Sequence, residues 1–366
     1  MLMEELLAEA FARGASDIHI SVGVPPVFRV TGRLVRTEYP PLSKDDCQRL
    51  IFSILSNEQR RTLEQNWELD FSYGIQGLGR FRVNVYKTRG TFAAAMRSIT
   101  SKVPSFEELG LPSIVKEIAN KPRGLVLVTG ATGSGKSTTL AAMIDWINEN
   151  KAEHILTIED PVEFLHASKK SVVHQRELGQ DTRSFANALR SALREDPDVV
   201  LVGEMRDLET ISLAITAAET GHLVMGTLHT SSAIQTVDRI VDVFPPEQQQ
   251  QIRVQLSNSL LAVFSQALVP RVNALKERVG RVLAQEIMVI SPAMANMIRE
   301  GKTAQMYSVI QTGTSIGMQT LEMALKSLYQ QGIVLYEDIL SKTSRPDDLK
   351  RMLESIGATP TSSTRT

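Results

Sequence analysis

The sequence predicts an α/β protein in two parts, a smaller module of mixed helices and strands and a larger part built on a parallel sheet. In residues 1–100, short segments with alternating apolar and polar side chains are typical of strands in a half-buried antiparallel sheet. After residue 120, short and continuous apolar runs alternate with helical stretches, which indicates a parallel sheet covered on both faces. The two patterns predict two domains with different kinds of sheet.

The first module is predicted to open with an amphipathic helix that carries Leu6 and Leu7 on its apolar face. Two further helices are expected over residues 43–56 and 57–66, with Ser43 and Ser56 as caps. An antiparallel sheet flanked by helices fits this order of elements. The expected strands are residues 17–21, 27–30, 34–36, 80–86 and 92–97.

A linker over residues 101–112, with prolines at positions 104 and 112, is predicted to join this module to a second domain over residues 113–356. The small and polar tail, residues 357–366, is predicted to be disordered. In the second domain, buried strands are expected at 125–129, 155–158, 199–202 and 223–227, and helices at 135–148, 247–268, 291–299 and 320–331.

The composition is that of a folded globular chain with a large core. Of 366 residues, 42% are hydrophobic and 22% are charged. Lys and Arg (40) nearly balance Asp and Glu (41), which argues against a nucleic-acid partner. The acidic N-terminus and the lack of about 18 consecutive apolar residues predict neither a signal peptide nor direct membrane insertion. The single Cys47 fits a cytoplasmic location and excludes a four-cysteine zinc site.

Residues 130–137 match the phosphate-loop pattern G-x-x-x-x-G-K-[ST] and directly follow an apolar strand. Glycines let the backbone fold around an anion, and the following helix adds the positive end of its dipole. Lys136 is expected to reach the β- and γ-phosphates of ATP, and Ser137 to ligate Mg²⁺. The predicted nucleotide contacts are Gly130, Thr132, Gly133, Ser134, Gly135, Lys136, Ser137 and Thr138.

Two other apolar strands end in polar residues that a parallel sheet places beside this loop. Glu204 follows the strand at 199–202 in the layout of a Walker B element and is a candidate Mg²⁺ ligand. Asp198 precedes that strand and is expected to cap the terminus of the preceding helix. His229 ends the strand at 223–228 and is a candidate contact for the γ-phosphate or the base.

A third strand runs into three carboxylates, Glu159, Asp160 and Glu163. One of them is a candidate general base that takes a proton from the attacking water. Their spacing does not choose among the three.

Arginines are a further group of candidates, because a guanidinium can stabilise the charge that develops in phosphoryl transfer. Alternation places Arg80 and Arg82 on one face of a strand, which fits either an anionic partner or an ordinary exposed surface. The candidates are Arg80, Arg82 and Arg97 in the first module and Arg190, Arg194 and Arg206 in the second.

Together these motifs resemble those of the secretion ATPase superfamily, and most closely those of its type IV pilus retraction ATPases. The resemblance extends from Gly14-Ala15-Ser16-Asp17-Ile18-His19 to the last helices. Its other motifs are the phosphate loop, the segment 157–163 as an aspartate box, the segment 188–204 ending in the Walker B Glu204, and the segment 220–230 as a histidine box.

The resemblance implies a PAS-like domain over residues 1–100 and a RecA-like ATPase domain, assembled as a cytoplasmic homo-hexamer. It selects Glu163 as the catalytic base and implies that Arg82 and Arg97, with Arg80, reach the nucleotide. It further implies a motor that uses ATP and Mg²⁺ to depolymerise pili. This motor would be recruited to the inner face of the cytoplasmic membrane by a pilus platform protein.

Two positions depart from the retraction-ATPase pattern. Ala131 stands where the family usually has proline, and Ala295 replaces an arginine in the helix over residues 293–300, which is tied to retraction. The second change favours an alternative, an accessory paralogue that works beside a second retraction ATPase.

Other functions stay open. Extension and secretion ATPases of the superfamily usually add an N-terminal domain and a four-cysteine subdomain, and this sequence shows neither. An ATP-gated scaffold with little hydrolysis is disfavoured by the presence of Glu163 and Glu204. A DNA-translocating motor is disfavoured by the near-zero net charge.

Overall fold

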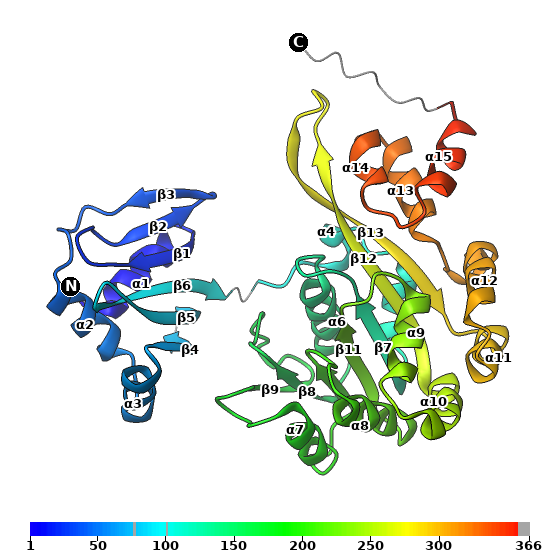
Figure 1. The fold of residues 1–366 in the computed structure, drawn as a ribbon, viewed down its shortest axis with the longest axis horizontal. Helices are drawn as coiled ribbons and strands as arrows, with labels where there is room; N and C mark the ends of the chain where they lie inside the picture. The colour runs from blue at the N-terminus through cyan, green and yellow to red at the C-terminus, as the bar shows by residue number, and fades with distance from the viewer. Residues whose placement is uncertain (76–77, 100–101, 358–366) are drawn as a thin grey trace. The chain divides into compact units, whose positions relative to one another are not determined.

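The structure, a computed structural model, describes residues 1–75, 78–99 and 102–357 (Figure 1). The chain forms two compact units. The first comprises Met1–Lys102 together with Pro161–Leu165, and the second comprises Val103–Asp160 and the chain from His166 onward. The first position of the predicted linker, 101, and the predicted disordered tail beyond Gly357 lie outside the described residues.

The first unit is built on a six-stranded antiparallel sheet with the strand order β3-β2-β1-β6-β5-β4. The sheet agrees with the antiparallel arrangement predicted from the alternating strands, and β4 is a strand that the prediction missed. The elements are α1 (Met3–Ala12), β1 (Ala15–Ile20), β2 (Val27–Val30), β3 (Arg33–Arg36), α2 (Lys44–Ser53), α3 (Asn57–Asn66), β4 (Glu68–Ile75), β5 (Gly79–Thr88) and β6 (Thr91–Ile99).

Alternation along β5 explains how this sheet buries one face. Phe81, Val83 and Val85 are almost completely buried, whereas Arg82 between them is exposed. The buried side chains pack with the apolar faces of α1 and α2. The predicted caps are confirmed, because Ser43 and Ser56 accept hydrogen bonds from the backbone N–H groups of the first turns of α2 and α3.

The second unit is built on a seven-stranded sheet with the order β13-β12-β7-β11-β10-β8-β9. Every neighbouring pair is parallel except β12 and β13. The elements up to α10 are α4 (Phe106–Leu109), α5 (Ser113–Ala119), β7 (Gly124–Thr129), α6 (Lys136–Asn150), β8 (His154–Glu159), β9 (Val172–Glu177), α7 (Phe185–Ala192), β10 (Val199–Val202), α8 (Leu208–Glu219), β11 (Leu223–Leu228), α9 (Ala233–Asp242) and α10 (Pro246–Ser259).

The central strand β7 shows that both faces of this sheet are covered. Leu125 and Leu127 pack with α7, α8, α9 and α10, while Val126 and Val128 pack with α5 and α6 on the other face. All four side chains are buried. The continuous apolar run therefore forms a fully buried parallel strand, which confirms the predicted α/β fold.

The predicted helix over residues 247–268 is wrong beyond Ser259. The chain turns extended at Leu260, and β12 (Leu260–Val272) pairs in parallel with β7 and antiparallel with β13 (Arg278–Val289). An apolar run buried on both faces has no periodicity that separates strand from helix. The segment forms a strand because the edge of β7 supplies hydrogen-bond partners for its backbone.

Helices α11 (Pro292–Glu300) and α13 (Leu321–Gln330) confirm the last two predicted helices. Helix α13 belongs to a small apolar cluster that packs against the β12–β13 hairpin. The remaining elements are α12 (Met306–Thr312), α14 (Tyr336–Leu340) and α15 (Pro346–Glu354). Over the ranges that the structure describes, no helix combines the length and the apolar character that crossing a membrane requires.

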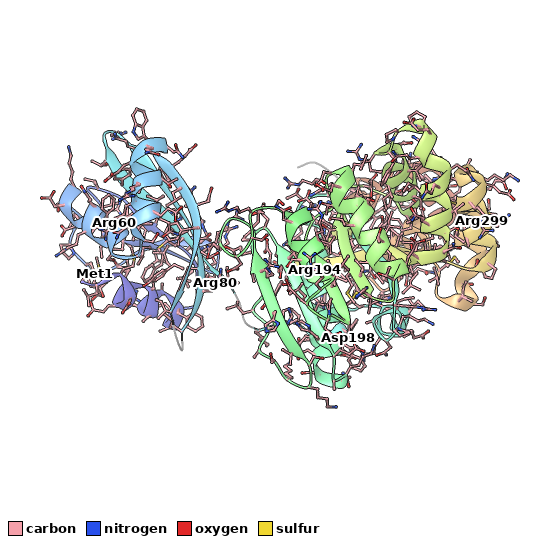
Figure 2. The ribbon with its side chains drawn as sticks, turned by 90° about the horizontal axis from the view of Figure 1, so that it is seen from below. Met1, Arg60, Arg80, Arg194, Asp198 and Arg299 are labelled. Carbon is pink, nitrogen blue, oxygen red and sulfur yellow. The ribbon has the colours of Figure 1, made fainter. Side chains whose placement is uncertain are left out.

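Asp198, labelled in Figure 2, does not cap a helix as predicted. Its carboxylate accepts a hydrogen bond of 2.8 Å from the backbone N–H of His154, the first residue of β8. The side chain therefore joins the starts of two neighbouring strands. It lies at the edge of the sheet opposite to the one where β10 ends.

Candidate active site

The phosphate loop connects β7 to α6, as the motif predicts. Gly130 has a φ of 138°, in the region that favours glycine. A Cβ atom at this position would lie 2.4 Å from the backbone oxygen of Gln266 in β12. Both the backbone angle and this close approach explain why the loop begins with glycine.

The N-terminus of α6 is open to an anion. Its cap, Gly135, has no side chain that accepts from the first-turn N–H groups. The Ser134 hydroxyl is buried and has no hydrogen-bond partner among the described residues. Unpaired donors at a helix start fit a phosphate group, so these residues suit the nucleotide that the motif predicts.

Lys136 folds back over the loop. Its Nζ donates to the backbone oxygens of Gly130 at 2.8 Å and Ala131 at 3.2 Å. The side chain is buried, and burial lowers the pKa of the ammonium group, while the negative charge of Glu204 opposes this effect. The interaction places Lys136 and Glu204 in the same site, as expected from the parallel sheet.

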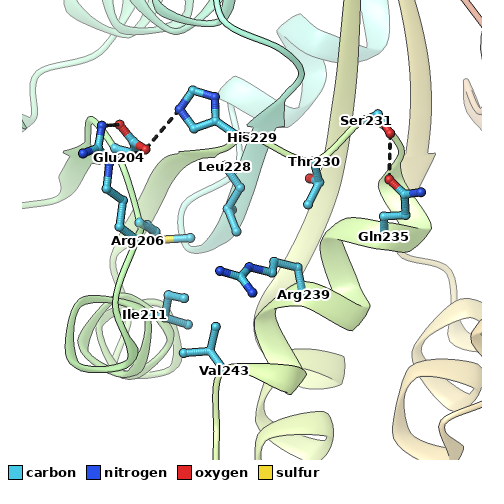
Figure 3. Close-up of a pocket in the computed structure, with 11 residues that line it drawn as sticks. Glu204, Arg206, Ile211, Leu228, His229, Thr230, Ser231, Gln235, Arg239 and Val243 are labelled. Atoms are coloured by element: carbon cyan, nitrogen blue, oxygen red, sulfur yellow. Dashed lines mark hydrogen bonds and ion pairs between the residues drawn. The ribbon is translucent and has the colours of Figure 1, made fainter.

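Glu204 lies just beyond the end of β10 and contacts two side chains, Arg206 and His229. Arg206 Nη2 donates to its Oε2 at 2.6 Å, and His229 Nε2 lies 3.0 Å from its Oε1 (Figure 3). Burial raises the pKa of Glu204, but the Arg206 hydrogen bond and the surrounding positive charges outweigh it and hold that pKa below its ordinary value. Glu204 is therefore an ionised carboxylate at neutral pH, which suits a metal ligand.

A pocket of about 600 Å³ opens beside Glu204 (Figure 3). Arg206 and Arg239 both line it, so an anion in the pocket meets positive charge. Arg239 lies inside α9 with no motif around it, and the sequence reasoning missed it. The lining residues are Glu204, Met205, Arg206, Ile211, Leu228, His229, Thr230, Ser231, Gln235, Arg239 and Val243.

A second pocket, of about 400 Å³, is lined by the phosphate loop. The loop itself forms one wall, and β12 with parts of the C-terminal helices forms the other. Arg281 and Lys342 contribute positive charge there. The loop thus has room for a ligand beside it, and β12 supplies part of the wall of this pocket.

Buried hydroxyl groups lie beneath the loop. Thr129, the residue before Gly130, lies 2.5 Å from Ser265 of β12 through their hydroxyl oxygens. Thr230, after His229, lies 2.6 Å from Thr236 of α9 in the same way. These contacts tie the end of β7 and the histidine box to neighbouring elements. The sequence carried no signal for the Thr129–Ser265 contact, because it depends on the register of β12.

Glu286 of β13 lies in line with these hydroxyl groups across the sheet, because Ser265 of β12 is paired with Thr129 on one side and with Glu286 on the other. The Glu286 carboxyl is buried and accepts a hydrogen bond of 2.6 Å from Ala233 N–H at the start of α9. Burial raises its pKa to about 7, and the charge of nearby Glu322 adds to this effect. The group is thus neutral in the folded chain over a range in which the unfolded chain is ionised.

We expect Glu286→Gln to remove part of the pH dependence of folding. Between the ordinary pKa of 4.5 and the folded value of about 7, the unfolded chain loses the proton and the folded chain keeps it. Stability therefore falls as the pH rises through this window, by on the order of 3 kcal/mol. Thermal unfolding at pH 5 and pH 8 measures the effect, with exposed Glu277→Gln as control. A Glu286→Gln variant with the pH dependence of the parent chain would contradict it.

The candidate arginines of the first unit lie on its sheet. Arg82 of β5 and Arg97 of β6 are directly opposite each other. Arg97 Nε donates to Asp17 Oδ1 at 2.8 Å and is largely exposed, so a carboxylate already accompanies it. Arg82 is exposed and has no partner among the described residues. Of the arginines in the second unit, Arg190 pairs with Glu209 and Arg206 with Glu204.

The three carboxylates of the aspartate box occupy different surroundings. Glu159 ends β8, is 9% exposed and accepts a hydrogen bond of 2.7 Å from Thr157. Asp160 and Glu163 are exposed. Glu163 belongs to the segment Pro161–Leu165, which groups with the first unit. The structure thus brings Glu204 and His229 to the phosphate loop, while the choice of Glu163 as base stays a prediction.

The predicted Mg²⁺ ligands fit a divalent ion by their chemistry. Ser137 exposes a hydroxyl in the first turn of α6, and Glu204 supplies an ionised carboxylate. Within the described parts of the chain, no group of three or more His, Cys, Asp or Glu side chains is arranged to hold a metal ion by itself.

Known proteins resemble the chain over nearly its whole length. Residues 1–341 match the type II/IV secretion system protein family. The type IV pilus retraction ATPase PilT of Pseudomonas aeruginosa is 54% identical over 348 residues, covering 95% of this chain and 100% of that protein. A twitching motility protein of Neisseria gonorrhoeae is 55% identical over 312 residues, covering 85% of this chain and 82% of that protein.

Another relative is the type IV pilus ATPase PilU of Pseudomonas aeruginosa, 40% identical over 354 residues, covering 97% of this chain and 92% of that protein. Among solved structures, the pilus retraction motor PilT with bound ADP superposes with a TM-score of 0.89 at 50% identity, covering 96% of this chain and 100% of that one. Fold and sequence agree, and the resemblance drawn from the motifs is confirmed. The chain belongs to the type II/IV secretion system protein family.

Proposed function

We propose that this chain is an ATP-driven motor that retracts type IV pili. The observation that carries the proposal is the match to PilT over that protein's full length at 54% identity. The phosphate loop, Lys136 and Glu204 are assembled at one edge of the sheet, which gives the chain the groups that ATP hydrolysis needs. The structure of PilT with bound ADP supports nucleotide binding in the same fold.

Each part of the site has a distinct task in this proposal. The N–H groups at the start of α6 and the Lys136 ammonium hold the phosphates. Ser137 and Glu204 hold Mg²⁺, which supplies positive charge against the phosphate oxygens when it is bound. His229 holds the Glu204 carboxylate by the 3.0 Å contact and is proposed to contact the γ-phosphate.

Glu163 is the proposed general base, which takes the proton of the attacking water. Arg82 and Arg97 are proposed to stabilise negative charge on the phosphates when the domains close around ATP. On binding ATP, Arg97 would replace its hydrogen bond to Asp17 by one to a phosphate oxygen. Arg82, which has no partner among the described residues, would bind phosphate without losing a contact. The exposure of both side chains supports this role.

The proposal extends to domains and assembly. A PAS-like domain over residues 1–100 and a RecA-like domain over residues 113–356 would form a homo-hexameric ring in the cytoplasm. The ring would act on a platform protein at the inner face of the cytoplasmic membrane. Rotation of one domain against the other on hydrolysis would supply the stroke.

Deletion of the gene in its host tests the motor function. We expect cells that carry many surface pili but do not move by twitching, because pili that cannot be withdrawn accumulate. Twitching zones and electron microscopy of the cell surface measure the two traits. Cells without pili would indicate an extension ATPase, and normal piliation with normal twitching would contradict both functions.

An accessory retraction ATPase is the second candidate, favoured by Ala295 and by the 40% identity to PilU. Ala295 lies in α11, whose last turn keeps Arg299 and Glu300. The two candidates separate in a host that lacks every retraction ATPase. A main motor restores twitching when it is the sole one present, whereas an accessory protein restores it only together with a second ATPase.

A further inference from the structure

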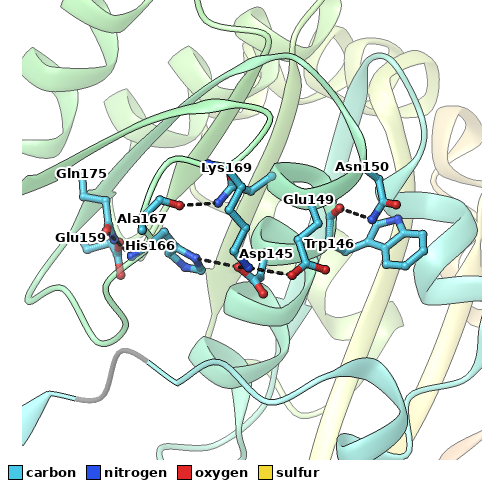
Figure 4. Close-up of polar contacts among 10 residues, drawn as sticks. Asp145, Trp146, Glu149, Asn150, Glu159, His166, Ala167, Lys169 and Gln175 are labelled. Atoms are coloured by element: carbon cyan, nitrogen blue, oxygen red, sulfur yellow. Dashed lines mark hydrogen bonds and ion pairs between the residues drawn. The ribbon is translucent and has the colours of Figure 1, made fainter.

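The side chain of Gln175 in β9 connects the two ends of the aspartate-box segment. Its Nε2 donates to Glu159 Oε1 at 3.3 Å, and its Oε1 accepts from the backbone N–H of His166 at 2.8 Å (Figure 4). Glu159 is the last residue of β8, and His166 is the residue at which the chain rejoins the second unit. Residues 160–165, which include Glu163, lie between these two contacts.

The register of β8 and β9 explains why Gln175 reaches both ends. In this parallel pair Gln175 lies opposite Thr157, and Glu159 follows two residues later on the same face. Thr157 Oγ1 donates to Glu159 Oε1 at 2.7 Å, so two donors share this oxygen. A nearly buried carboxylate depends on such donors, because leaving it unpaired is costly. Thr157 and Gln175 therefore fix the side chain of Glu159.

The chain beyond His166 is anchored to α6, the helix that begins at Lys136. Asn148 is fully buried and donates to Ala167 O at 2.8 Å, while its Oδ1 accepts from Lys169 N–H at 2.9 Å (Figure 4). The Lys169 ammonium pairs with Asp145 and Glu149 of the same helix, at 2.7 and 2.8 Å. One end of the segment is therefore fixed to β8 and the other to the phosphate-loop helix.

His166 itself is held by packing. Its side chain is only 3% exposed, and its Nδ1 lies 3.9 Å from Asp145 Oδ1, beyond hydrogen-bond distance. Burial lowers the pKa of the imidazole, so it is neutral near pH 7 and forms no ion pair there. The backbone N–H of His166 donates to Gln175 Oε1, so the Gln175 amide forms a polar link between the two ends.

We propose that Gln175 is a positioning residue for ATP hydrolysis. By holding the two residues that flank the segment 160–165 together, it fixes the position of Glu163 within that segment. The proposal rests on the proposed role of Glu163 as general base. The contacts of Gln175 are with the two ends of this segment, so we expect it to act through the geometry of the segment. Displacing a catalytic group by about 1 Å can lower the rate by about 10²-fold. Loss of the contacts at the two ends of the segment is therefore expected to lower the rate of hydrolysis strongly.

The first test is Gln175→Met, which keeps the length of the side chain and removes both hydrogen bonds. We expect kcat for ATP hydrolysis to fall about 10-fold or more, with the KM for ATP changed by less than about two-fold. The matched control is Gln331→Met, which removes one exposed hydrogen bond to Ser327 on α13. Binding of a fluorescent ADP analogue reports that the variant is folded. Equal losses in kcat and in nucleotide binding would indicate a merely structural role and overturn the proposal.

An exchange of the two side chains tests the pairing itself. Gln175→Glu keeps the acceptor for His166 N–H but sets a second carboxylate against Glu159, and we expect it to lower kcat. Combining it with Glu159→Gln puts an amide donor opposite the new carboxylate, with the same total charge. The double variant should recover a large part of the lost kcat. A double variant no more active than Gln175→Glu alone would overturn the pairing.

Glu163→Gln separates failure of this proposal from failure of the proposed function. If Gln175 acts through Glu163, adding Gln175→Met to Glu163→Gln should lower the residual turnover by less than about two-fold. A further fall as large as in the parent chain would show that Gln175 does not act through Glu163. If Glu163→Gln alone had normal turnover, the base assignment itself would be wrong and the positioning role would fall with it.

Discussion

Glu163→Gln is expected to bind Mg-ATP normally and to hydrolyse it at least about 10²-fold more slowly, because the amide cannot accept the proton of the attacking water. The carboxylate is exposed and lies outside the apolar core of the first unit, with which its segment groups, so the change should leave folding intact. Steady-state phosphate release gives kcat, and titration with a fluorescent nucleotide gives the affinity.

The control for this variant is Glu64→Gln, an exposed carboxylate on α3. We expect its turnover to match that of the parent chain. Near-normal turnover of Glu163→Gln would remove Glu163 from the role of base and direct attention to Asp160 or Glu159. A loss of nucleotide affinity equal to the loss in kcat would instead indicate that Glu163 contributes to binding.

Lys136→Ala should abolish tight nucleotide binding. The Nζ of Lys136 lies over the loop on the oxygens of Gly130 and Ala131, where it can exchange these carbonyls for phosphate oxygens. Without the ammonium group, the β- and γ-phosphates lose a direct positive partner. The thermal stabilisation by saturating nucleotide, which follows from binding to the folded chain alone, should disappear.

Lys44→Ala, an exposed residue at the start of α2, is the control and should keep the nucleotide-induced shift of the parent chain. The unfolding temperature of Lys136→Ala without nucleotide separates binding from folding, since removal of a buried charge should not destabilise the unit strongly. Unchanged nucleotide affinity in Lys136→Ala would contradict the assignment of the phosphate loop.

Local chemistry made much of the site predictable. The phosphate loop needs glycines, a lysine and a hydroxyl in a fixed order, and each is required within a few residues of the next. Glu204 and His229 were accessible because parallel strands bring their carboxyl ends to one edge. The position of Glu163 relative to these groups was not accessible in this way, since its choice came from the resemblance to retraction ATPases.

Long-range pairing was the part that the sequence left undecided. The run from Leu260 to Leu268 suits a buried helix and a buried strand equally well, and the prediction chose the helix. The correct strand creates the pocket beside the phosphate loop and sets Ser265 against Thr129. Gln175 had no signal either, because its two partners depend on how β9 pairs with β8.

The sequence by itself determined the two-part α/β fold, the phosphate loop and the acidic and histidine residues at the strand ends. These features depend on periodicity, on residue order and on the rule that parallel strands end together. Only the tertiary structure decided the pairing of β12 with β7, the Arg206 and His229 contacts of Glu204 and the position of Gln175 between Glu159 and His166. Hydrogen bonds between distant segments follow from strand register, which no local pattern in the chain encodes.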